Sequence, residues 1–385
     1  MERAELNAWL RLTLAPGIGN TTARKLLAAF GSPEAIFSQT DVALRQLGNS
    51  KLVAAVRHVP EGLPSLLDAT LAWLAAGDDR CIAALGDAAY PAGLLNIEDP
   101  PLMLYMLSAQ LNRAQAAINN AANSLAIVGS RNPTPQGELN ARQFAKAFAE
   151  QGLCVVSGLA LGVDGAAHDG ALLGALDGTC ATIAVVGTGL DRVYPKKHLS
   201  LAHRIAARGM IISEFPIGTP PITANFPKRN RIISGLSAGT LVVEAALKSG
   251  SLITARLASE QGKDVFAIPG SIHSPQSRGC HYLIKQGAKL VENAQDVLEE
   301  LNPAVPASKA DAAVGTEDES GDTDEASPSE TALLKALGFD IVSLDAIQAR
   351  TGLPTPELQA GLFELEMGGV VKRLPGGLFQ RLSVG

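Results

Sequence analysis

The sequence has few cysteines and no long apolar run. Its 385 residues include 4 cysteines, which are scattered without a CxxC pair. This spacing argues against a disulfide framework and against a zinc site, and we expect neither a metal nor a cofactor. No segment approaches the ~18 consecutive apolar residues of a membrane span, and the charged start MERAELNAWL does not resemble a signal peptide. We therefore expect a cytoplasmic protein that does not contact a membrane.

Aromatic side chains are also scarce, at 4% of the sequence, although hydrophobic residues reach 46%. The 38 glycines, together with the alanines, supply many small side chains. Small side chains suit close packing of helices against a sheet. A chain of this length has room for two or three domains.

The acidity of the chain is concentrated in one segment. The formal net charge is −6, but residues 301–330 alone hold 8 Asp/Glu and 1 Lys/Arg, with almost no large apolar residue. Such a composition cannot bury enough surface to offset the entropy of ordering, so we predict an acidic disordered linker over residues 302–328. Residues 125–300 hold 17 Lys/Arg and 14 Asp/Glu. This mildly basic centre is compatible with a polyanionic partner.

The larger part of the chain divides again near residue 79. Residues 1–78 show the apolar periodicity of helices around Gly17-Ile18-Gly19 and predict a helical, SAM-like or helix-hairpin-helix domain. The glycine turn resembles that of a DNA-binding helix-hairpin-helix, but the modest flanking charge slightly favours a plain interhelical turn. Residues 79–301 alternate short Val/Ile-rich runs with helical patterns. Because these runs are continuously apolar, we expect an α/β fold with a mainly parallel, doubly wound, Rossmann-like sheet.

Cations and small residues follow several of the predicted strands. The carboxyl ends of parallel strands share one edge of a sheet, and ligands bind there. Glycine allows close approach of the backbone, and Lys and Arg bind phosphate oxygens. A run of such groups suits the backbone of a single-stranded nucleic acid. The residues that we expect to contact it are Gly129, Ser130, Arg131, Lys196, Lys228, Arg229, Asn230, Arg231 and Lys263.

Each of these cations also has a structural interpretation. A Lys/Arg cluster is commonly a solvated face, and Arg231 suits a buried ion pair with an acidic residue. Glu244 suits helix capping or an ion pair better than catalysis, and His168 suits a structural position because no nucleophile or metal partner is evident. The sequence lacks GxxxxGK[ST] and a complete GxGxxG, which disfavours ATPase and dinucleotide-binding functions.

Six segments, in a fixed order, carry a resemblance to a known family. They are GSRNPT, SGLALGVDGAAH, GTGLDRVYP, EFPIGTPPITANFPKRNRIISGLS, GSLITARLASEQGKDVFAIPG and RGCHYLIKQGA. They resemble the DNA-processing protein A (DprA/Smf) family. The resemblance implies a homodimeric, extended Rossmann fold that binds single-stranded DNA without sequence preference and has no catalytic turnover. It also implies protection of incoming DNA in natural transformation, and loading of RecA onto strands covered by single-strand-binding protein.

The resemblance places the family's phosphate-binding positions on the GSR motif, on Lys196, on the KRNR block (Lys228–Arg231) and on Lys263. Two positions depart from the family pattern, because His198 and His281 stand where Asn is common. Grooves of this kind usually offer aromatic platforms to the bases. The nearby candidates are Tyr194, Phe226 and Tyr282, with Leu199 where a relative stacks a ring.

Residues 329–385 resemble a winged helix, with three helices followed by a two-stranded wing. In a DNA-reading winged helix the third helix carries cations into the major groove. Here that helix bears Glu357, Glu364 and Glu366 and no Lys or Arg. We therefore expect a protein-contact or regulatory module.

Two other functions stay open from the sequence. A nucleotide phosphoribohydrolase on a related Rossmann variant shares strand-end arginines and a GT-x-x-E signature, but Thr240 and Glu244 lie one residue too far apart here. A RecA adaptor with incidental cations is the third candidate. Salt-dependent binding of single strands, with no release of base from AMP, would favour the nucleic-acid groove over both.

Overall fold

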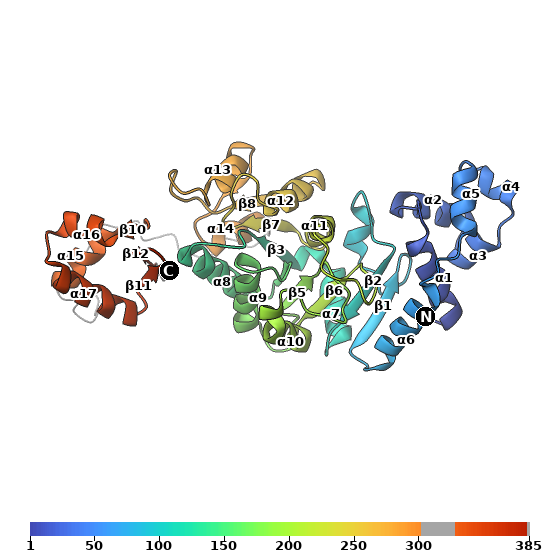
Figure 1. The fold of residues 1–385 in the computed structure, drawn as a ribbon, viewed down its shortest axis with the longest axis horizontal. Coiled ribbons are helices and arrows are strands. Elements are labelled where there is room, and N and C mark those ends of the chain that lie inside the picture. Colours follow the sequence, from blue (N-terminus) through green and yellow to red (C-terminus); the bar gives the residue numbers. More distant parts are fainter. Residues whose placement is uncertain (302–327, 383–385) are drawn as a thin grey trace.

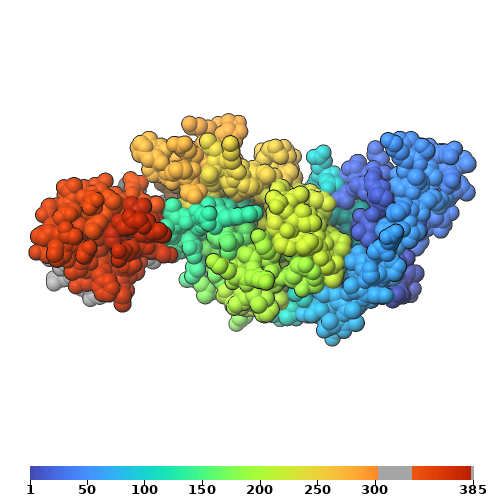
Figure 2. Space-filling model, viewed as in Figure 1, coloured from blue at the N-terminus to red at the C-terminus, as the bar shows by residue number. Residues whose placement is uncertain are grey.

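The structure is a computed structural model that describes residues 1–301 and 328–382. The predicted acidic linker, residues 302–328, lies outside these ranges except for its last residue. The helical N-terminal part and the C-terminal winged helix lie at opposite ends of the central sheet (Figure 1), and the molecule is elongated (Figure 2). In the described ranges, no helix is long and apolar enough to cross a membrane.

The N-terminal part is helical, as predicted. Its described residues form α1 (Arg3–Leu14), α2 (Asn20–Phe30), α3 (Pro33–Ser38), α4 (Asp41–Arg45), α5 (Ser50–Arg57) and α6 (Leu63–Ala75). Leu6 and Leu10 are fully buried in a core that also contains Ala84 and Met103, which belong to the first two strands of the sheet. The helices and the edge of the sheet therefore share one core.

A second connection joins α2 to the loop that precedes the second strand. The Asn20 side-chain amide donates to Asp99 Oδ2 at 3.1 Å, and the Arg24 guanidinium donates to the carbonyl oxygen of Glu98 at 2.8 Å. These bonds hold the helical part against the central domain.

Among the described residues, the central sheet has nine strands in the order β1-β2-β6-β5-β4-β3-β7-β8-β9. All neighbours from β6 to β9 in this order are parallel, while β1 and β2 pair antiparallel at one edge. Every residue of β3 to β7 is buried, which explains their continuously apolar sequences. The strands are β1 (Arg80–Ala84), β2 (Met103–Leu107), β3 (Ser124–Val128), β4 (Cys154–Ser157), β5 (Thr182–Val185), β6 (Met210–Ser213), β7 (Gly239–Val242), β8 (Asp264–Ala267) and β9 (Lys289–Leu290).

Helices cover both faces of the sheet, and this confirms the predicted α/β class. One face carries α7 (Leu111–Asn119), α11 (Asn225–Gly235), α12 (Ser251–Glu260) and α13 (Arg278–Lys285). The other carries α8 (Pro135–Glu150), α9 (Val163–Gly174), α10 (Leu199–Arg208) and α14 (Ala294–Leu301). Three 3-10 turns, among the described residues, complete this part: η1 (Ala92–Asn96), η2 (Ala121–Asn123) and η3 (Lys196–His198).

Part of the high glycine content serves contact between two helices rather than between helix and sheet. Gly170 and Gly174 of α9 face the backbone carbonyls of Arg142 and Lys146 on α8, and a Cβ at either glycine would collide with them. The two helices can therefore approach more closely than side chains would allow.

The direction of strand addition reverses between β3 and β7. The chain adds β4, β5 and β6 on one side of β3, and then α11 returns across the sheet so that β7 pairs on the other side. The loops after β3 and β7 diverge from this switch point. Open α/β sheets bind ligands in the crevice that such diverging loops create.

The described residues 328–382 form the predicted winged helix. Its helices are α15 (Pro328–Leu337), α16 (Leu344–Thr351) and α17 (Thr355–Met367), and its strands β10 (Val342–Ser343), β11 (Val371–Leu374) and β12 (Leu378–Arg381) pair in the order β10-β12-β11. Leu337, Ile347 and Leu358 are fully buried in a separate core. The acidic residues of α17, the third helix, are exposed.

Candidate nucleic-acid interface

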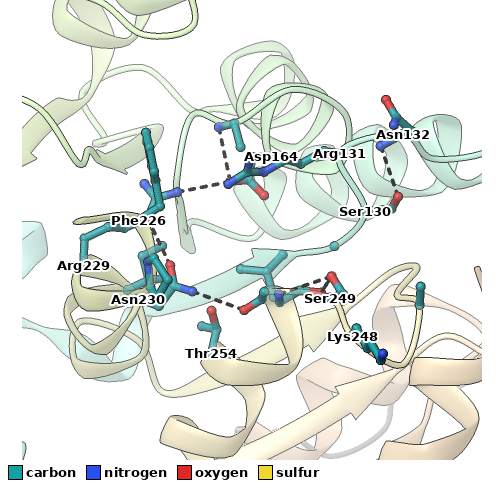
Figure 3. Close-up of a pocket in the computed structure, with 18 of the residues that line it drawn as sticks. Ser130, Arg131, Asn132, Asp164, Phe226, Arg229, Asn230, Lys248, Ser249 and Thr254 are labelled. Carbon is teal, nitrogen blue, oxygen red and sulfur yellow. Dashed lines mark hydrogen bonds and ion pairs between the residues drawn. The ribbon is translucent and has the colours of Figure 1, made fainter. Parts of the chain in front are cut away.

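A pocket of about 400 Å³ opens at the switch point (Figure 3). Its walls come from the loops after β3 and β7 and from the first turns of α11 and α12. Of the residues selected from the sequence, it brings together Gly129, Ser130, Arg131, Arg229 and Asn230.

The loop after β3 supplies a tightly fixed backbone and one exposed guanidinium. Ser130 is buried, and its Oγ accepts a hydrogen bond from the Asn132 amide at 3.1 Å, while its carbonyl accepts from Val163 N at 3.1 Å. A Cβ on Gly129 would lie 2.7 Å from Val163 Cγ2, so this glycine is also required for α9 to pack against the end of β3. Arg131 is exposed at the rim.

Three planar side chains line up beside the pocket. The guanidinium carbon of Arg131 lies 5.6 Å from the centroid of the Phe226 ring, and the centroids of Phe226 and Tyr194 are 5.6 Å apart with the rings tilted by 39°. Tyr194 is 45% exposed, so its ring is accessible. We call these residues the Arg131–Phe226–Tyr194 ledge. Nucleic-acid bases stack on rings and guanidinium planes of this kind.

Arg229 is a buried cation under the pocket. It is 4% exposed, and its guanidinium donates to the carbonyl oxygens of Gly158 and Val185 and lies 3.8 Å from Asp164 Oδ2. Burial lowers the pKa of Arg229 to about 10 and raises the pKa of Asp164. Arg229 stays protonated at neutral pH, so it places positive charge behind the pocket without reaching solvent.

Arg231 is buried and fully engaged by the protein. It is 8% exposed and forms a two-pronged ion pair with Glu214 at 2.7 and 2.6 Å, while its Nε donates to the carbonyl of Asp99 at 2.8 Å. The expectation that all cations of the KRNR block reach the rim therefore needs correction. Lys228 is its exposed cation, with Nζ at 3.6 Å from Glu214 Oε2.

Neither Lys263 nor Lys196 lines the pocket. Lys263 Nζ donates to the carbonyls of Ser234 at 2.6 Å and Gly235 at 2.9 Å, at the C-terminal end of α11, where a cation complements the helix dipole. Burial lowers the pKa of Lys263 to about 8, and its side chain lines a separate groove that also contains Tyr282. Lys196 is exposed in η3, two residues after Tyr194.

Glu244 and His168, for which the sequence suggested structural rather than catalytic roles, both bond neighbouring protein groups. Glu244 accepts hydrogen bonds from Thr134 Oγ1 at 2.6 Å and Thr134 N at 2.9 Å, so it supports the N-cap residue of α8 rather than pairing with an arginine. His168 is fully buried, with Nδ1 at 2.7 Å from Thr182 Oγ1, and burial lowers its pKa to about 3. It is therefore uncharged at neutral pH and lies away from the pocket.

The two histidines that depart from the family pattern keep hydrogen bonds to the backbone. His198 Nδ1 lies 3.0 Å from the carbonyl oxygen of Leu159, and His281 Nε2 lies 2.9 Å from that of Gly270. Leu199 is 50% exposed beside this turn and is free to contact a base.

The residues of one wall of the pocket were not among those predicted from the sequence to contact nucleic acid. This wall consists of the loop after β7 and the first turn of α12, with Lys248, Ser249, Ser251 and Thr254. The usable signal was the KSGS segment, because it follows a strand end and opens a helix. Its serines carry no charge, and its single cation, Lys248, stands apart from any cluster of cations in the sequence.

Comparison with known proteins supports a common origin for both domains. Residues 81–302 match the profile of the family described as DNA recombination-mediator protein A, and residues 317–377 match the DprA winged helix domain. Protein Smf from Escherichia coli (strain K12) is 41% identical over 318 residues, which cover 81% of this chain and 80% of that protein. DNA processing protein DprA from Streptococcus pneumoniae is 44% identical over 56% of this chain and 72% of its own length.

Solved structures agree with the sequence matches. The X-ray structure of DNA processing protein A from Streptococcus pneumoniae has a TM-score of 0.63 at 36% identity, and the match covers 78% of this chain and 98% of that one. A structure concerned with the single-stranded DNA binding mode of DNA processing protein A from Helicobacter pylori has a TM-score of 0.50 at 30% identity, over 58% of this chain and 96% of that one. On these matches, the chain belongs to the DNA recombination-mediator protein A family.

Proposed function

We propose that this chain binds single-stranded DNA along the carboxyl edge of its sheet and acts as a recombination mediator, not as an enzyme. The observation that carries the proposal is the ledge of Arg131, Phe226 and Tyr194 beside a cation-rimmed pocket at the switch point. Phosphate-binding groups next to exposed rings match the alternation of phosphate and base in an unpaired strand. The single-strand binding mode of the Helicobacter pylori relative supports the same conclusion.

The phosphate-binding groups form a track across neighbouring strand ends. Lys248 follows β7, Arg131 follows β3 and Lys196 follows β5, and the sheet order between them is β7-β3-β4-β5. Three strand spacings make a track of about 14 Å. We propose that Gly129, Ser130, Arg131, Lys196, Lys228, Asn230 and Lys248 contact the strand along it.

The buried cations of the block have an indirect part in this proposal. Two of them tie α11 to other elements: Arg229 donates to the carbonyl of Gly158, and Arg231 donates to Glu214. Lys263 donates to the Ser234 carbonyl at the C-terminal end of α11. Because α11 also carries Phe226 and Asn230, we propose that these cations fix the position of the ledge.

The finer parts of the function follow from the family. We propose that the chain forms a homodimer, protects incoming strands in natural transformation, and helps load RecA onto strands covered by single-strand-binding protein. The exposed acidic residues of α17 support a protein-contact role for the winged helix, since they would repel phosphate.

A titration of fluorescent oligo-dT at several salt concentrations tests the proposal. With three phosphate contacts, we expect log K to fall against log salt with a slope of about −2, and duplex of the same length to bind more weakly. Arg131→Ala is expected to weaken binding about tenfold and to reduce the slope by about 0.7 without lowering Tm.

Arg204→Ala is the matched control, because Arg204 is an exposed arginine on α10 that pairs with Asp169 and lies outside the pocket. A salt slope near zero, or equal losses in the two arginine variants, would contradict the track. Release of adenine from AMP would instead indicate the phosphoribohydrolase, a function that the bonds of Glu244 to the N-cap residue of α8 disfavour.

A further inference from the structure

A hydrogen bond joins two parts of the wall of the pocket at the switch point. The Gln276 side-chain amide, in the loop before α13, donates to the carbonyl of Asn132 at 3.1 Å, and the Gln276 carbonyl accepts from Ala245 N at 2.7 Å. The volume of the pocket, about 400 Å³, lies in the range of small-molecule sites.

One hydroxyl in the wall of this pocket has no protein partner among the described residues. Thr254 is 1% exposed and lines the pocket, and no described residue forms a hydrogen bond with its side chain. Figure 3 shows its oxygen on the side that faces Asn230. Because polar groups in protein interiors are normally paired, a pocket-lining hydroxyl without a protein partner is available to a ligand atom with hydrogen-bonding capacity.

Other hydrogen-bond donors line the same pocket as Thr254. Ser249 Oγ and Ser251 Oγ are 2.6 Å apart, and because one hydrogen suffices for that bond, a second hydroxyl hydrogen stays available. Both serines precede or begin α12, a ten-residue helix whose N-terminus favours an anion. Lys248 adds an exposed ammonium at the mouth.

We propose that this pocket binds a phosphomonoester, either the terminal phosphate of a single strand or the phosphate of a free nucleoside monophosphate. An internal phosphodiester has one charge and two free oxygens. A monoester has three acceptor oxygens and a charge near −2 at neutral pH, which suits the cluster of hydroxyls, Lys248 and the α12 N-terminus. The strand-end form of this inference rests on the proposed function.

The test compares oligo-dT molecules of one length that differ only in their ends. The full chain is titrated with a 5′-phosphorylated form, a 3′-phosphorylated form, a form with hydroxyls at both ends, and a closed circle. One phosphorylated form is expected to bind about tenfold more tightly than the hydroxyl-ended form, which is about 1.4 kcal/mol. dTMP and inorganic phosphate are titrated separately by calorimetry.

Thr254→Val removes the hydroxyl and keeps the side-chain shape. It is expected to reduce the preference for the phosphorylated end to less than about threefold. Thr179→Val is the control, because the Thr179 hydroxyl bonds the Leu176 carbonyl at 2.8 Å near the start of β5, at the opposite edge of the sheet. Ser249→Ala, at a half-buried position, serves if the valine variant does not fold.

The outcomes separate the two proposals. Equal Kd values for the linear forms and the circle, together with no binding of dTMP, would overturn the phosphomonoester site while the proposed function stands. Binding of dTMP that is lost in the Thr254 variant, without an end preference, would support the site with a free nucleotide as its ligand. If no oligonucleotide binds, the proposed function fails, and dTMP alone decides whether the pocket binds a phosphomonoester.

Discussion

Arg231→Ala is the substitution for which the sequence and the structure lead to different expectations. A cation at the rim would contribute affinity for DNA and little stability. The structure instead buries Arg231 and joins it to Glu214, whose side chain is 6% exposed, and to the loop that holds Asp99. We therefore expect the alanine variant to lose stability first.

The size of that loss follows from the charge left behind. Removing one partner of a buried ion pair costs about 3–5 kcal/mol, mainly because the other charge stays buried without compensation. Lys228 Nζ lies 3.6 Å from Glu214 Oε2 and offers partial compensation, so the lower end of that range is expected. In a domain of this size, about 3 kcal/mol corresponds to a fall in Tm of about 6–12 °C.

A double-mutant cycle with thermal unfolding measures this. The cycle uses Arg231→Met, Glu214→Leu and their combination, because the double variant removes both charges and leaves apolar side chains, and it is expected to recover most of the Tm lost in the Arg231 variant. Oligo-dT affinity is measured on each variant at a temperature where all are folded. A Tm unchanged in Arg231→Ala, together with a tenfold weaker affinity, would refute the structural assignment and return Arg231 to the DNA track.

Three further predictions test other parts of the structure. Phe226→Ala is expected to weaken oligo-dT binding by about 1–3 kcal/mol, whereas Tyr282→Ala, away from the ledge, should change it little in the same titration. Deletion of residues 302–385 should leave the Kd within about tenfold in a gel shift, because α17 exposes carboxylates; a larger loss would give the winged helix a direct role. The pKa of Lys263 is about 8 in the folded protein and ordinarily 10.5, so folding releases a proton between these values and stability should rise with pH across that window. Lys263→Met should reduce this rise in Tm, and an unchanged pH profile would argue against the buried lysine.

The fold was predictable because most central strands carry two signals in the sequence, a continuously apolar run and a small residue at or beside its end. A run such as LAIV is apolar throughout and is followed by a glycine, which indicates both a doubly buried strand and the start of a loop at its carboxyl end. The winged helix was predictable for a similar reason, since its helices alternate with short turns. What the pattern does not contain is the order of the strands, which only the structure gives.

The candidate site was predictable only at the level of loops. Ser130 and Arg131 follow a strand directly, so their place at the carboxyl edge follows from topology. The KRNR block lies within α11, where neighbouring residues point in different directions around the axis, so four adjacent polar residues cannot share one surface. Which of them is buried depends on partners that are distant in the sequence, such as Glu214 for Arg231 and Asp164 for Arg229.

The bonds of Asp99 have a consequence for the helical part of the chain. Its carboxylate accepts from Asn20 on α2, and its carbonyl accepts from Arg231 on α11, the helix that bears Phe226. A partner protein that displaces the first helices would therefore act, through Asp99, on α11 and on the Phe226 ring, where we propose that a base stacks. The helical N-terminal part could in this way change the affinity for DNA without contacting DNA itself.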